Sequence, residues 1–115
     1  MMTRKYKIHF NKGRQYLLFH IGSSLRKFRT DNKCHAYYVA AENRKQRSGL
    51  FGHIHIPEEQ VTPALFEELK AHEIYHAVED WWTCRKGNVL SDKNEEIRAL
   101  IMGEISRKIH GKIGV

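Results

Sequence analysis

The segment 72–76, His-Glu-Ile-Tyr-His, constrains the fold of this chain more than any other feature of its sequence. Residues four apart lie on the same face of an α-helix, so a helix here brings the imidazoles of His72 and His76 together, with the carboxylate of Glu73 beside them. Two imidazoles at this spacing supply two of the ligands that Zn²⁺ needs, and the glutamate supplies a base. The segment therefore predicts a helix that carries a zinc site.

A zinc ion with one open position needs a third protein ligand, and we predict Glu96 for this role. The residues between His76 and Glu96 leave room for the end of one helix, a loop and the first turn of a second helix. Glu96 shares a stripe of that second helix with the small residues Ala99 and Gly103, which would let the two helices approach closely. Glu95 lies about 100° round the helix. We assign Glu95 to capping or to a hydrogen bond with a ligand, and an exchange of roles between the two glutamates is the alternative.

The HExxH segment followed at this distance by Glu96-Ile97-Arg98-Ala99 resembles the gluzincins, the thermolysin-like branch of the zinc metallopeptidases. The resemblance covers about residues 50–110 and implies a zinc-dependent peptidase, with zinc bound by His72, His76 and Glu96 and with Glu73 as the general base. In gluzincins an edge strand that pairs with extended substrate precedes the HExxH helix. The resemblance assigns this place to residues 50–56, where Gly52 would allow close backbone approach.

Thermolysin-like enzymes carry a large second domain after the third ligand, whereas this sequence continues only a short way beyond residue 111. The chain therefore resembles a minimal gluzincin and is loosely similar to the compact ImmA/IrrE-type proteases. This implies a protein or peptide substrate, expected to be one specific target such as a regulatory protein of a phage or mobile element. The group that stabilises the transition state is not fixed by the sequence, and His53, His55, His110 and Tyr75 are the candidates.

Hydrophobic periodicity predicts strands in the first half of the chain and helices in the second. Alternation over residues 6–10, a turn at Asn11-Lys12-Gly13 and an apolar run over residues 15–21 indicate a hairpin, followed by a short helix from Ser23. Residues 35–41 and 50–56 suit two more strands. We expect a single α+β domain over residues 1–115, in which a small antiparallel sheet within residues 1–56 is followed by two antiparallel helices.

The predicted HExxH helix spans residues 62–82, with Thr62 as N-cap and Pro63 at its first position. We expect its core-facing stripe to contain both metal-binding histidines, and it consists of Leu65, Leu69, His72, His76 and Glu79. The second helix spans residues 91–110 with a capping start at Asp92. The residues expected to fill the core from this helix are Ile97, Leu100, Ile101, Ile105 and Ile109.

The formal net charge of +7 raises the alternative of a partner with negative charge. Basic residues cluster at positions 4–7, 26–29 and 44–47 next to aromatic residues, a pattern found in proteins that bind single-stranded nucleic acid, although a solvated basic surface is the favoured explanation. The second functional hypothesis is thus a zinc-stabilised binding module whose basic face contacts nucleic acid or an acidic partner. An intact Glu73 favours the peptidase, because a purely structural zinc site does not use a base.

Targeting signals are not evident in the sequence. The charged N-terminal residues are not followed by the apolar region of a signal peptide, and no apolar run approaches the roughly 18 residues of a membrane span. We therefore expect a cytoplasmic protein that does not enter a membrane.

Overall fold

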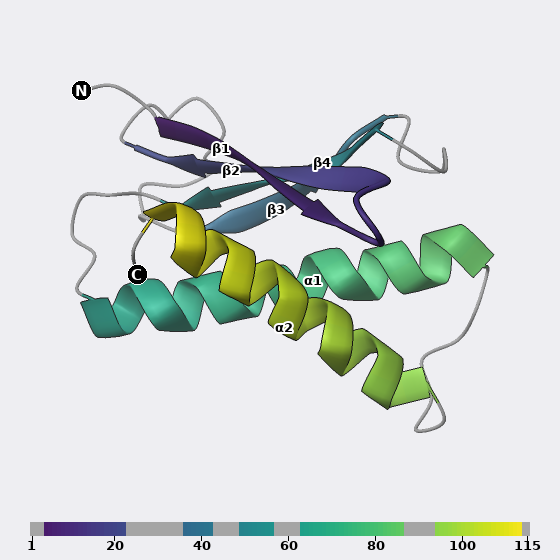
Figure 1. Ribbon diagram of the computed structural model, residues 1–115. Helices are drawn as coiled ribbons and strands as arrows, with labels where there is room; N and C mark the ends of the chain where they lie inside the picture. Colours follow the sequence, from purple (N-terminus) through teal and green to yellow (C-terminus); the bar gives the residue numbers. More distant parts are fainter. Residues whose placement is uncertain (1–3, 23–35, 43–48, 57–62, 87–93, 114–115) are drawn as a thin grey trace.

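The computed structural model describes residues 4–22, 36–42, 49–56, 63–86 and 94–113. These residues form a four-stranded sheet and two helices that lie against the same face of the sheet (Figure 1). The strands are β1 (Arg4–Phe10), β2 (Gln15–Ile21), β3 (Tyr37–Ala40) and β4 (Gly49–Ile56), and the helices are α1 (Pro63–Lys86) and α2 (Glu95–Ile113). The predicted α+β class, with the sheet before the helices, is confirmed.

The predicted hairpin joins β1 to β2 as an antiparallel pair. Its turn uses positive φ angles at Asn11 (55°), Lys12 (59°) and Gly13 (78°), and the N–H of Arg14 donates to the carbonyl of Asn11 at 3.2 Å. Asparagine and glycine tolerate this left-handed region better than most residues, which is why the sequence signal was reliable.

The sheet has the strand order β1-β2-β4-β3 and is mixed, so the prediction of an antiparallel sheet is wrong. β4 inserts between β2 and β3, and it runs parallel to β2 and antiparallel to β3. Parallel neighbours need a long connection, and residues 22–48 between β2 and β4 provide one. The alternation of residues within a strand indicates which side chains are buried. It does not indicate whether the neighbouring strand runs parallel or antiparallel, so the sequence did not distinguish a mixed sheet from an antiparallel one.

α1 packs beneath β3 and β4 with a face different from the predicted one. The side chains that it buries are Lys70, Glu73, Ile74, Ala77, Val78, Trp81 and Trp82. His72 and His76 are exposed instead, as is Leu65. The apolar residues at 74, 77, 78 and 81 recur at helical spacing and form the buried face. The predicted stripe contains three polar residues, so its burial is less favourable.

α2 runs back across α1 and packs against β1 (Figure 1). Its buried residues are Arg98, Ile105 and Ile109, which define the side of the helix that faces the rest of the fold. The expectation that Ile97 and Leu100 fill the core is wrong, because their side chains are 47% and 64% exposed.

Polar contacts hold both helices to the hairpin. The indole N–H of Trp81 donates to the side-chain oxygen of buried Gln15 at 2.9 Å, and the Lys108 ammonium donates to the carbonyl of His9 at 2.7 Å. A buried amide whose oxygen is paired avoids the cost of an unsatisfied polar group.

The short helix expected from Ser23, the N-cap Thr62 and the capping residue Asp92 lie outside the described residues. Neither helix in the described part of the chain is long and apolar enough to cross a membrane.

Candidate functional site

The middle of α1 presents His72 and His76 side by side on its outer surface. Their Nε2 atoms lie 3.0 Å apart, and the two rings are nearly perpendicular, with centroids 4.6 Å apart. Two nitrogen ligands of one zinc ion, at bond lengths of about 2.0–2.1 Å and the tetrahedral angle, lie about 3.3 Å apart. The observed separation is close to this value, so the pair fits a shared metal ion.

Glu73 turns in the other direction and is 5% exposed, between α1 and the sheet. One of its carboxylate oxygens, Oε2, lies 4.0 Å from Nε2 of His72. Burial raises the pKa of Glu73, while His72, His76 and a hydrogen bond from the backbone of Tyr38 partly offset the rise. A carboxyl group with a raised pKa beside a pair of imidazoles is a better proton acceptor than an ordinary surface glutamate.

An open cavity of about 480 Å³ lies over these groups, between α1 and β3. Its lining residues are Ala36, Tyr37, Tyr38, His72, Glu73, His76 and Asp80. The Tyr38 hydroxyl donates to Asp80 Oδ2 at 2.8 Å, which joins β3 to α1 one turn beyond His76. Two imidazoles, a buried carboxylate and a cavity are thus brought together by one helix and one strand.

The strand at the site is β3, not the predicted strand 50–56. β4 is paired on both sides, with β2 and with β3, so it is not an edge, and β3 ends the strand order of the described sheet. Gly52 allows β3 and β4 to pair closely. A Cβ atom there would lie 2.7 Å from Cε1 of Tyr38 and 2.9 Å from the carbonyl oxygen of Val39, so the close approach that glycine permits is that of β3.

Glu96, the predicted third ligand, is exposed on the first turn of α2 and does not line the cavity. The side of α2 that faces the fold is fixed by Arg98, and at 100° per residue Glu96 lies about 160° from Arg98, whereas Glu95 lies about 60° from it. Glu95 is also exposed. The buried residue at this end of α2 is therefore a cation, whose guanidinium donates to Asn94 Oδ1 at 2.8 Å and does not bind metals.

Two of the predicted transition-state donors lie away from the cavity. The Tyr75 side chain is exposed and is hydrogen-bonded to Glu79, which raises the pKa of Tyr75. His110 is exposed in the last turn of α2, where a histidine suits the helix dipole.

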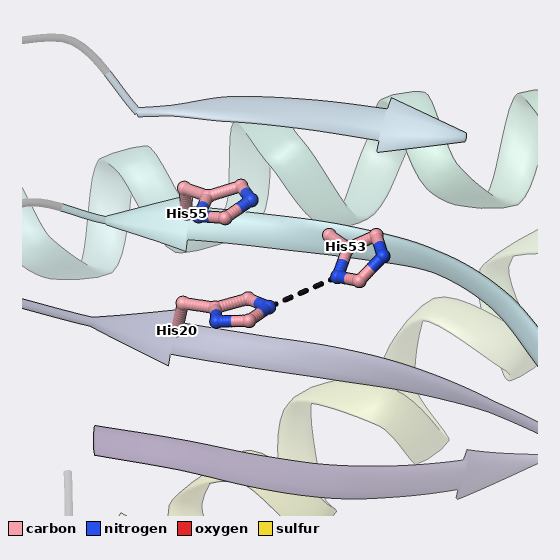
Figure 2. Close-up of side chains that lie close together, drawn as sticks. All are labelled: His20, His53 and His55. Atoms are coloured by element: carbon pink, nitrogen blue, oxygen red, sulfur yellow. Dashed lines mark hydrogen bonds between the residues drawn. The ribbon is translucent and has the colours of Figure 1, made fainter. Parts of the chain in front are cut away.

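His53 and His55 lie on the face of the sheet opposite the helices, where they meet His20 of β2 (Figure 2). Nε2 of His20 is 3.0 Å from Nδ1 of His53. Burial and the nearby charge of Lys5 lower the pKa of His53. These histidines form a group of their own and do not face the cavity beside Glu73.

Sequence reasoning did not identify Tyr38, Asp80 or His20 as site residues. Asp80 follows His76 by four residues, so its place on the same side of α1 was a usable signal. Tyr38 and His20 had no such signal, since they reach their groups only through the pairing of β4 with β2 and β3.

Of the three basic clusters, only residues 4–7 are described. Arg4, Lys5 and Lys7 are exposed on β1, and the Lys7 ammonium lies 4.8 Å from the centre of the Tyr16 ring. This is a cation–π contact within the sheet. The clusters at 26–29 and 44–47 lie outside the described residues.

Comparison of the chain with protein-family models, with curated proteins and with solved structures finds no match.

Proposed function

We propose that this chain is a small zinc-dependent peptidase whose centre is the cavity between α1 and β3. His72 and His76 would hold the zinc ion, and a carboxylate from the first turn of α2 would complete the ligand set. The orientation of α2 favours Glu95 for this third position over Glu96, the residue predicted from sequence. Zinc in such a site supplies Lewis-acid polarisation of a carbonyl and activation of water.

The observation that carries the proposal is the arrangement of three side chains. Two imidazole nitrogens lie 3.0 Å apart, close enough to bind one ion, and a buried carboxylate oxygen lies 4.0 Å from one of them. Glu73 would accept a proton from the attacking water and deliver it to the leaving amine. A zinc site that only stabilised the fold would not require a buried base at this distance.

The position of β3 supports an extended peptide as substrate. Ala41 N–H donates to the Phe51 carbonyl at 3.0 Å, so the odd-numbered residues of this strand face β4 and the backbone of Tyr38 and Ala40 faces the outer edge. A peptide added along this edge would run past His72 and His76, with main-chain hydrogen bonds supplying affinity. The Tyr38 N–H already donates to Glu73, so a peptide would pair with the Tyr38 carbonyl and with Ala40, and the strand would align substrate and base together.

The decisive experiment compares the wild type with Glu73→Gln on a mixed peptide library, read by mass spectrometry in the presence of Zn²⁺. The change keeps the shape and removes the base, so we expect bound zinc to stay and cleavage to fall at least about 100-fold. Glu68→Gln, an exposed glutamate on the same helix, is the matched control and should cleave like the wild type.

Cleavage that survives Glu73→Gln would overturn the proposed mechanism. If neither protein cleaves while both hold zinc, the alternative of a zinc-stabilised binding module is favoured. A steep loss of nucleic-acid affinity with added salt would then identify the basic face as the binding surface.

A further inference from the structure

Three histidines meet on the outer face of the sheet, on the side away from both helices (Figure 2). His20 and His55 are direct partners in the register of β2 and β4, and His53 precedes His55 by two residues, so all three side chains project from the same face. One nitrogen from each ring lies within 4.8 Å of the other two, and the closest pair, in His20 and His53, is 3.0 Å apart.

The surroundings hold the rings in place. His55 is stacked between His20, at a centroid distance of 4.3 Å, and Tyr37, at 4.7 Å. His20 and His55 are only 6% and 5% exposed, while His53 is partly open to solvent. Rings fixed by strand pairing and stacking lose little conformational freedom when they bind a ligand, which is the requirement for a preorganised site.

Imidazole is a ligand for Zn²⁺, Ni²⁺ and Cu²⁺ rather than for Mg²⁺ or Ca²⁺. With bonds of about 2.0–2.1 Å, two nitrogens on one ion lie about 2.9 Å apart at a right angle and about 3.3 Å apart at the tetrahedral angle. The pair formed by His20 and His53 already meets this spacing, and a nitrogen of His55, within 4.8 Å of both, would move closer on binding. Lys5, opposite His20 on β1, is exposed to solvent, which weakens the repulsion between its charge and a bound cation.

We propose that His20, His53 and His55 form a second metal site, for a divalent transition-metal ion that favours imidazole. It uses none of the residues of the cavity between α1 and β3 and lies on the other face of the sheet. Three protein ligands leave at least one coordination position for water or an external ligand, and the partial exposure of His53 gives access to it. The inference does not depend on the proposed peptidase activity.

Zinc titration of the metal-stripped protein by calorimetry tests this site. The wild type should bind two ions and the double variant His72→Ala/His76→Ala one. In the double variant background, His53→Gln should weaken the remaining site at least about 100-fold, since losing even an outer partner of a ligand costs about 10- to 100-fold. His9→Gln, on β1 of the same sheet, is the matched control and should leave that affinity unchanged.

A second measurement leaves the three histidines intact and needs only the double variant, whose two substituted side chains are exposed. In the double variant, the imidazole NMR signals of His20, His53 and His55 should shift together on addition of Zn²⁺, while those of His9 and His110 stay in place. The proposal is overturned if these three signals do not respond at about millimolar zinc, or if His53→Gln and His9→Gln bind zinc equally well.

Discussion

Tyr38 links the two halves of the candidate site. Its backbone hydrogen-bonds to Glu73, and its hydroxyl donates to Asp80 at 2.8 Å. One residue of β3 therefore positions the proposed base and also fixes the strand to α1. A group held by two independent contacts is oriented more precisely than one held by either alone.

The burial of Glu73 should make the metal-free protein less stable at neutral pH. Its pKa is raised by burial, so the stabilising protonated form is fully present below the pKa of the unfolded chain and is lost as pH rises through the folded pKa. Glu73→Gln keeps a neutral side chain at every pH. We expect the variant to melt at a higher temperature than the wild type at pH 7, with a difference that shrinks towards about pH 4.

Thermal unfolding followed by circular dichroism, with a chelator present, measures this difference. Glu68→Gln provides the comparison, because an exposed glutamate should show little change at either pH. Equal melting temperatures for wild type and Glu73→Gln at pH 7 would show that the carboxylate is not destabilised by its burial.

At the scale of elements, the spacing between β3 and β4 depends on Gly52. Gly52→Ala would place a methyl group 2.7 Å from the Tyr38 ring and 2.9 Å from a backbone oxygen of β3, so the strand must shift. We expect a loss of about 1–3 kcal/mol in the free energy of unfolding, as for other overpacked sites. Urea denaturation measures the change, and weaker zinc binding should accompany it.

Gly111→Ala is the matched control for this substitution. Gly111 lies within α2, and a Cβ atom there would meet nothing within 4 Å. Alanine should therefore stabilise the helix by up to about 1 kcal/mol. If both variants changed stability in the same direction, the steric role of Gly52 would be refuted.

The orientation of α2 makes a second prediction at this scale. Arg98, Ile105 and Ile109 turn inward, which leaves Glu95 nearer than Glu96 to the side that faces the rest of the fold. Glu95→Gln should therefore lower zinc affinity at the site of His72 and His76 at least about 100-fold, more than the loss of an outer partner, while Glu96→Gln should have little effect. Calorimetry in the His53→Gln background isolates this site.

If Glu96→Gln lowers zinc affinity more than Glu95→Gln does, Glu96 is the third ligand, as its position on one helical stripe with Ala99 and Gly103 predicts. Full zinc affinity in both variants would mean that neither glutamate completes the ligand set.

At the scale of the whole molecule, local patterns predicted the elements, and long-range pairing decided what they build. Alternating residues in β1, the turn at residues 11–13 and Pro63 at the start of α1 depend on neighbours within a few positions. The closeness of His72 to His76 was equally local, because helix geometry alone determines it.

The insertion of β4 beside β2 is not encoded within either strand. The position of β4 depends on how much apolar side-chain surface the complete sheet buries. This single choice made β3 an edge strand of the described sheet, brought Tyr38 to Glu73 and paired His20 with His55. The inward side of α2 likewise includes buried Arg98 beside Ile105 and Ile109, and a hydrophobic pattern does not select an arginine for the core.

Zinc should couple the two helices and so stabilise the whole molecule. If an ion at His72 and His76 is also bound by α2, zinc at 100 times its Kd adds about 2.7 kcal/mol to the free energy of unfolding. For a domain of this size that corresponds to a rise of about 10 °C in Tm. His72→Ala/His76→Ala should remove this rise without loss of core packing, since both side chains are exposed, and any rise that remains should vanish with His53→Gln. Differential scanning calorimetry with and without zinc provides the measurement. A wild-type Tm that does not respond to saturating zinc would mean that neither proposed site binds zinc in the folded protein.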